Sequence, residues 1–230
     1  MTTPKTPLGE HLAAVVRKRL GSLRENADSV LSTDSVDAVH DVRVASRRLR
    51  AFLDVFRPAM DPSVHTAAKK ALRKLSRAMG PLRDADVLAL AVAEHGARAG
   101  SDLDKASVDL IRVHLHGLRE EARESGRKKL RKIDLRDVED AIRAALDSAL
   151  SHLPEDPLGT SLFALSLLSP FVVKMQDAAE HAASERAEDL HELRIRAKRV
   201  RYAVELLQPC LGEAYRALHE QIQAVQETLG

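Results

Sequence analysis

HDVRVASRRLR, residues 40–50, and HELRIRAKRVR, residues 191–201, are two versions of one stretch that decides how this chain folds. Each begins with a histidine and an acidic residue, carries basic residues at matching spacings, and runs on to a proline, Pro58 or Pro209. The copies lie 151 positions apart in a chain of 230 residues. A single basic stretch is typical of a solvated helix face. A repeated one indicates a two-fold-like site for an anion.

Helical spacing separates the two kinds of side chain in each copy. At about 100° per residue, the basic residues fall on one side of a helix and the apolar residues on the other. Cations three or four positions apart lie about 5–6 Å from one another and repel. The acidic residues Asp54 and Glu205 can neutralise only the last cation of each stripe. We therefore expect a polyanion to neutralise the rest. The predicted contacts are His40, Arg43, Arg47 and Arg50 in the first copy and His191, Arg194, Lys198 and Arg201 in the second.

The composition is that of a soluble globular protein, with 44% hydrophobic and 30% charged residues. Because the formal net charge is only +2, a basic site must come from segregation of charge. The longest apolar run, residues 162–173, contains Pro170 and is too short to cross a bilayer. Residues 1–10 do not resemble a signal peptide. The single Cys210 excludes an intrachain disulfide and fits a reducing cytosol.

Strand signals are nearly absent, because aromatic residues make up 3% and Val and Ile follow helical periods. We predict an all-α protein with short loops, in which consecutive helices pack antiparallel. Gly80-Pro81 is predicted to separate two helices, Pro170 to kink or divide a third, and residues 125–133 to be the least ordered stretch. The predicted helices are 8–28, 36–57, 62–79, 82–98, 102–126, 135–151, 158–184, 187–208 and 211–228.

The repeat extends beyond the basic helices. Gly80 and Gly230 correspond at an offset of 150, and residues 153–157 form a joint between two halves. We expect one domain over 1–230, with a first half at 8–152 and a second half at 158–230 that lacks its last helix. A shortened version of a longer protein would look the same in sequence.

Three motifs, in this order, resemble those of the CHAD family, the conserved histidine α-helical domain. They are HDVRV with RRLR from residue 40, GPLRDADV from residue 80, and HELRI with KRVRY from residue 191. The resemblance covers essentially the whole chain. It implies two helical bundles related by a pseudo-two-fold axis, with a central basic groove that binds inorganic polyphosphate. Gln223 departs from the family pattern, which usually has a Lys seven residues before the position of Gly230.

Polyphosphate also suits the residues themselves, since guanidinium groups meet phosphate oxygens bidentately. Arg17 and Arg73 are predicted as further contacts. We predict non-catalytic polyphosphate binding with no metal or cofactor, in the cytoplasm or at polyphosphate granules, with no membrane partner. For His40 and His191, a structural hydrogen bond and direct anion contact both stay open.

Other basic and acidic residues have plainer interpretations. Arg48 and Arg199 lie about 80° from the stripes and are predicted salt-bridge partners. Asp84 and Asp86 are predicted to cap a helix and to pair with Arg. The series Arg112, His116, Arg119 and Arg123 could line the groove or form a solvated mixed-charge face.

Three other functions stay open. His40-Asp41 is similar to the pair used by metal-dependent phosphohydrolases, but the remaining histidines have no ligand spacing. Nucleic-acid binding lacks aromatic stacking platforms, although duplex binding through backbone charge stays open. A purely structural bundle is compatible with 34 acidic against 36 basic residues.

Overall fold

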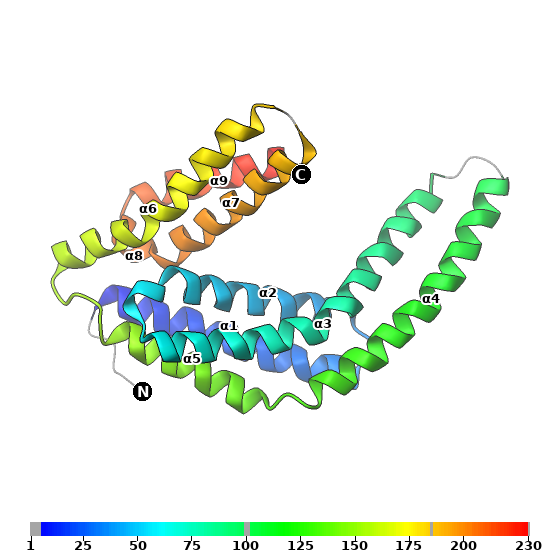
Figure 1. Ribbon diagram of the computed structural model, residues 1–230, viewed down its shortest axis with the longest axis horizontal. Coiled ribbons are helices and arrows are strands. Elements are labelled where there is room, and N and C mark those ends of the chain that lie inside the picture. The colour runs from blue at the N-terminus through cyan, green and yellow to red at the C-terminus, as the bar shows by residue number, and fades with distance from the viewer. Residues whose placement is uncertain (1–5, 99–101, 185, 230) are drawn as a thin grey trace. The chain divides into compact units, whose positions relative to one another are not determined.

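The computed structural model describes residues 6–98, 102–184 and 186–229, and every regular element within these ranges is helical. The elements are α1 (Pro7–Ser32), α2 (Val36–Val55), the 3-10 helix η1 (Arg57–Ala59), α3 (Pro62–Gly96), α4 (Asp102–Leu130), α5 (Leu135–Leu150), α6 (Pro157–Ala182), α7 (Ala187–Leu206), α8 (Gln208–Leu211) and α9 (Ala214–Thr228) (Figure 1). The all-α prediction is confirmed. The pseudo-two-fold relation and the central groove stay predictions.

Two prolines lie inside helices, and one of them, Pro81, was predicted to begin a separate helix. α3 continues through Gly80-Pro81, so the predicted helices 62–79 and 82–98 are one element. Pro170 lies inside α6 and does not divide it. A proline inside a helix removes one backbone hydrogen bond. Around Pro81, Met79 and Leu82 are buried, and this packing on one apolar face holds the helix together.

The end of α4 also differs from its prediction. The basic run that begins at Arg127 was expected in the least ordered stretch, but it forms the last turn of α4. The reason is tertiary: the Arg127 guanidinium donates hydrogen bonds to the carbonyl oxygens of Val30 and Thr33 and to Asp34 Oδ1. These contacts come from residues more than 90 positions away, which local sequence cannot reveal.

The chain divides into two compact units, and the sequence ranges of these units alternate along it. The first contains Met1–Lys18, Arg48–Lys69 and Asp140–Gly230, and the second contains Arg19–Arg47 and Lys70–Glu139. The predicted halves, 8–152 and 158–230, stay a prediction. In the first unit, α7 packs against both α6 and α9, and the Phe52 and Phe56 rings are buried with centroids 5.7 Å apart.

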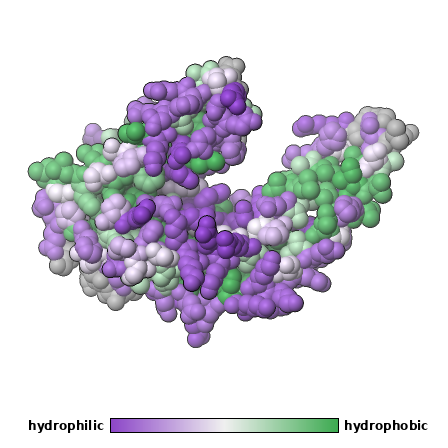
Figure 2. Space-filling view, viewed as in Figure 1, coloured by the Kyte–Doolittle hydropathy of each residue, from purple (hydrophilic) through white to green (hydrophobic). Residues whose placement is uncertain are grey.

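The second unit contains α4 and α3 from Lys70 onward, and these two helices approach closely at two places. A Cβ atom on Gly126 would lie 3.4 Å from the Ala78 carbonyl oxygen, and one on Gly96 would lie 2.6 Å from Val108. Beyond Asp86 these two helices expose many apolar side chains, visible as a green area in Figure 2. They are Val87, Leu88, Leu90, Leu110, Ile111, Val113 and Leu118.

α6 is unusual because it is apolar on two sides. Ala164, Leu167 and Leu168 are buried on the side that packs within the first unit. Leu158, Leu162, Leu165 and Val173 are exposed on the opposite side. Among the described helices, α6 alone is long and apolar enough to cross a membrane, by length and composition only. The core helix of a soluble protein passes the same test, so this is weak evidence for a span.

Candidate anion-binding site

The first basic helix, α2, has the two-sided character that its spacing predicted. Val42, Leu49 and Leu53 are buried on the apolar side. On the other side, Arg47 is exposed and forms no ion pair with any residue that the structure describes. His40 is also exposed, and Arg43 and Arg50 are half-buried. The basic side of α2 therefore includes an unpaired, accessible cation at its middle.

The second motif of the sequence lies beside the first. Arg43 Nη1 is 3.8 Å from the position that a Cβ atom on Gly80 would occupy. The absence of a side chain at Gly80 leaves space along this part of Arg43. The GPLRDADV stretch thus begins, in the second unit, next to one of the predicted anion contacts.

The second basic helix, α7, carries its predicted contacts on a less open surface. His191 is exposed, whereas Arg194, Lys198 and Arg201 are half-buried. The Nε atom of Arg194 is buried and has no hydrogen-bond partner. An N–H group without an acceptor costs about 1–3 kcal/mol, so an anion oxygen at this position would stabilise the site.

Residues of both copies meet at the end of α7, around Glu205 and Tyr202. Arg48 Nη1 donates to Glu205 Oε2 at 3.0 Å, and Arg201 Nε lies 3.6 Å from Glu205 Oε1. The buried Tyr202 ring has both guanidinium groups against it, with the Cζ atoms of Arg48 and Arg201 at 5.6 and 5.5 Å from its centroid. We call Arg48, Arg201, Tyr202 and Glu205 the arginine–tyrosine cluster.

The arginine–tyrosine cluster holds more positive than negative charge. One carboxylate serves two permanent cations, and His219 Nε2 lies 3.8 Å from the same Oε1 atom. The Nε atoms of Arg48 and Arg201 are buried without a hydrogen-bond partner. His11 Nε2 bonds the Glu205 carbonyl oxygen at 2.9 Å, which joins α1 to this end of α7. The cluster therefore contains two N–H donors that no acceptor in the described part of the chain satisfies.

The remaining predictions for basic residues divide. Arg48 is a salt-bridge partner, as predicted, but its contact with Tyr202 was missed. Arg199 is exposed and forms no ion pair with a residue that the structure describes, so its predicted pairing stays a prediction. Arg17 and Arg73 are exposed, and no hydrogen bond or ion pair joins either to another described residue.

The three arginines of the basic series on α4 are each paired with an acid. Arg112 pairs with Asp109, Arg119 Nε bonds Asp86 Oδ1 at 2.7 Å, and Arg123 pairs with Glu120. Of the two interpretations left open for this series, these ion pairs favour a mixed-charge face over the lining of a basic groove. The ion pair with Arg119 confirms the predicted pairing of Asp86 with Arg. Asp84 and Asp86 both lie inside α3, so the prediction that they cap a helix is wrong.

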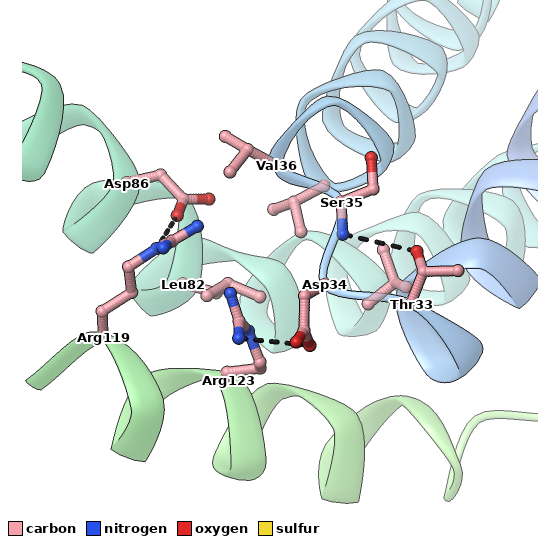
Figure 3. A pocket seen from close by; sticks show the side chains of 10 residues that line it. Thr33, Asp34, Ser35, Val36, Leu82, Asp86, Arg119 and Arg123 are labelled. Atoms are coloured by element: carbon pink, nitrogen blue, oxygen red, sulfur yellow. Dashed lines mark hydrogen bonds and ion pairs between the residues drawn. The ribbon is translucent and has the colours of Figure 1, made fainter. Parts of the chain in front are cut away.

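Arg119 and Arg123 line a small pocket in the second unit. Figure 3 shows Asp86 facing Arg119 on one side and Arg123 bonded to Asp34 on another. Asp86 is 5% exposed, and its Oδ2 atom has no hydrogen-bond partner. The pocket is lined by similar numbers of acids and bases, so it does not favour a polyanion.

Two titratable groups outside the cluster are perturbed mainly by burial. Burial lowers the pKa of the His65 imidazole, and the charges of Lys69 and Arg57 lower it further. Burial raises the pKa of the Cys210 thiol, which disfavours a reactive thiolate. No group of three or more His, Cys, Asp or Glu residues suited to a metal ion occurs in the part of the chain that the structure describes.

A family model for the CHAD domain matches residues 14–230. The chain belongs to the CHAD domain family. The fold agrees with a crystal structure of the CHAD domain from the plant Ricinus communis, with a TM-score of 0.76 and 21% sequence identity, over 97% of this chain and 73% of that one. This structural likeness supports the all-α fold and no more.

Two Mycobacterium tuberculosis proteins are also similar to this CHAD chain. They are named Uncharacterized protein MT2285, from strain CDC 1551 / Oshkosh, and Uncharacterized protein Rv2226, from strain H37Rv. Each is 28% identical over 190 residues, which is 76% of this chain. The chain spans about a third of the length of these relatives, 35% in both.

Proposed function

We propose that this CHAD chain binds inorganic polyphosphate without catalysing a reaction, through the basic sides of α2 and α7. The observation that carries the proposal is the arginine–tyrosine cluster, where cations of both sequence copies share one carboxylate. Two arginine Nε atoms there lack acceptors. Phosphoryl oxygens match this need, because guanidinium groups bind them through paired hydrogen bonds.

A linear polyanion fits better than a small anion because the cations continue along both helices. Arg43 and Arg47 precede Arg48 on α2, and Arg194 and Lys198 precede Arg201 on α7. Each successive phosphate of one chain would then bind at a high effective concentration. The predicted set stands as the proposed contacts, with Arg48 added to it. The set is His40, Arg43, Arg47, Arg50, His191, Arg194, Lys198, Arg201, Arg17 and Arg73.

Nucleic acid is the less suitable partner because base stacking needs exposed aromatic rings. Tyr202 is buried with two guanidinium groups against it, and Phe52 and Phe56 are core residues. A mineral polymer needs no stacking surface. The cytoplasm and polyphosphate granules are the proposed locations.

The test is thermal unfolding with and without ligand. At a hundredfold excess over Kd, a ligand of the folded state adds about 2.7 kcal/mol, or roughly 5–10 °C in Tm for a chain of this size. Long-chain polyphosphate should give such a shift. Orthophosphate at the same phosphate concentration should give much less, because its contacts are not linked.

Two results would count against the proposal. Equal stabilisation by orthophosphate and polyphosphate indicates a small-anion site. Displacement of bound polyphosphate by duplex DNA of equal total charge, at equal concentration, indicates a general polyanion surface.

A further inference from the structure

We infer that Glu205 is a built-in competitor for the bound anion. In the free protein its carboxylate occupies the Arg48 and Arg201 guanidinium groups, and a phosphoryl group of the ligand takes its place. The inference rests on the proposed function and adds a specificity-determining residue to it.

The contacts of Glu205 suit a carboxylate that can be displaced. Oε2 accepts from Arg48 at 3.0 Å, whereas Oε1 lies at 3.6 Å from Arg201 and 3.8 Å from His219, beyond hydrogen-bond length. The Glu205 side chain is 25% exposed, so it has a path to water. One good hydrogen bond to Arg48 and one longer ion pair to Arg201 hold it in place.

The two arginines have a separate support that would keep them in position after Glu205 leaves. Each guanidinium lies against the buried Tyr202 ring, at 5.6 Å for Arg48 and 5.5 Å for Arg201. A cation over the face of an aromatic ring is attracted by the negative charge of its π electrons. A phosphoryl group would therefore meet two arginines whose geometry does not depend on the carboxylate alone.

Displacement of Glu205 affects short and long ligands differently. Orthophosphate and tripolyphosphate replace the Glu205 contacts and gain few others. A long chain loses the same contacts once and regains attraction at further cations along α2 and α7. It can also bind those cations without displacing Glu205. The carboxylate thus lowers the affinity for short anions more than the affinity for long chains, and this difference gives specificity for long chains.

The test is isothermal titration with tripolyphosphate and with long-chain polyphosphate at one salt concentration. Glu205→Gln removes the charge but keeps the shape and a hydrogen-bond acceptor for Arg48. We expect it to bind tripolyphosphate about tenfold more tightly, the effect of losing a charged hydrogen-bond competitor. The gain for the long chain should be smaller.

Glu192→Gln is the matched control. Glu192 lies on the same helix and pairs with Arg196 at 2.6 Å, so the variant removes one equal charge away from the arginine–tyrosine cluster. Less than a twofold change in tripolyphosphate affinity is expected there. An equal gain in both variants would mean a general effect of net charge and would overturn the inference.

The remaining outcomes separate the two proposals. If wild type binds long-chain polyphosphate and Glu205→Gln binds tripolyphosphate no more tightly, Glu205 is a structural or positioning residue and the inference alone fails. If wild type binds neither ligand, the proposed function fails and the inference fails with it.

A second measurement uses only the wild-type protein and so does not depend on the folding of a variant. Tripolyphosphate should shift the NMR signals of the Nε–H groups of Arg48 and Arg201. Unshifted signals under saturating ligand would contradict displacement of Glu205.

Discussion

The two basic helices have nearly the same pattern of charge but different partners. α2 and α7 are both 20 residues long, and each buries its apolar side. Asp54, near the end of the first stripe, pairs with Lys69 of α3 at 3.2 Å. Glu205, at the equivalent place in the second, bonds Arg48 of the other copy. A repeated sequence therefore places cations at the same positions, while the neighbouring helices decide how far those cations are neutralised.

The helices that precede them differ in the same way. α1 and α6 are both 26 residues long. Leu8 is 1% exposed and Leu12 is fully buried, whereas Leu158 and Leu162, 150 positions later, are 70% and 59% exposed. The leucines are repeated at equivalent positions of the two helices, but only those of α1 are buried. What covers a helix face is a property of the packed molecule and not of the helix.

The largest expected effect comes from reversing one cation in each basic helix. Arg47→Glu combined with Lys198→Glu should weaken polyphosphate binding roughly a thousandfold, because like charges placed together cost several kcal/mol. Titration calorimetry measures the affinity, and circular dichroism checks that helicity is kept.

Arg199→Glu provides the control for this pair of reversals. Arg199 is exposed, lies off the stripe, and forms no ion pair with a described residue. Its reversal should change the affinity by a few fold at most. Binding retained in the double variant, or lost equally in the control, would move the site to another surface.

A smaller effect is expected for stability, and it tests the comparison of α1 with α6. Leu8→Ala removes a fully buried side chain and should lower the free energy of unfolding by about 3 kcal/mol. Leu158→Ala, at the equivalent exposed position, should lower it by less than about 0.5 kcal/mol. Urea unfolding measures both. Equal losses would mean that the outer face of α6 is covered in solution.

The all-α fold and most helices follow from the sequence because they depend on local spacing. Helical periodicity and short loops predicted the starts of α2, α3, α4 and α7 correctly. The prediction of a helix end at Pro81 was wrong because it considered only the backbone hydrogen bond that a proline lacks. Buried residues on either side of Pro81 stabilise α3 as one helix. The end of α4 was misplaced for a similar reason, since Arg127 is fixed by carbonyl groups of α1 and the following loop.

The candidate site was predicted less completely than the fold. Spacing put Arg47 and Lys198 on one side of each helix, and it excluded Arg48 because that residue lies off the stripe. Angle on one helix, however, says nothing of the helix that packs beside it. Arg48 reaches Glu205 across 157 positions of sequence, and Tyr202 contacts two guanidinium groups only in the folded chain.

The most direct test is a titration of the wild-type chain with polyphosphates of graded length over a series of salt concentrations. The account predicts that affinity per chain rises with length and falls steeply with salt, because each neutralised phosphate releases counterions. Affinity that is the same for short and long chains, or that does not change with salt, would contradict a cationic surface built from two helices.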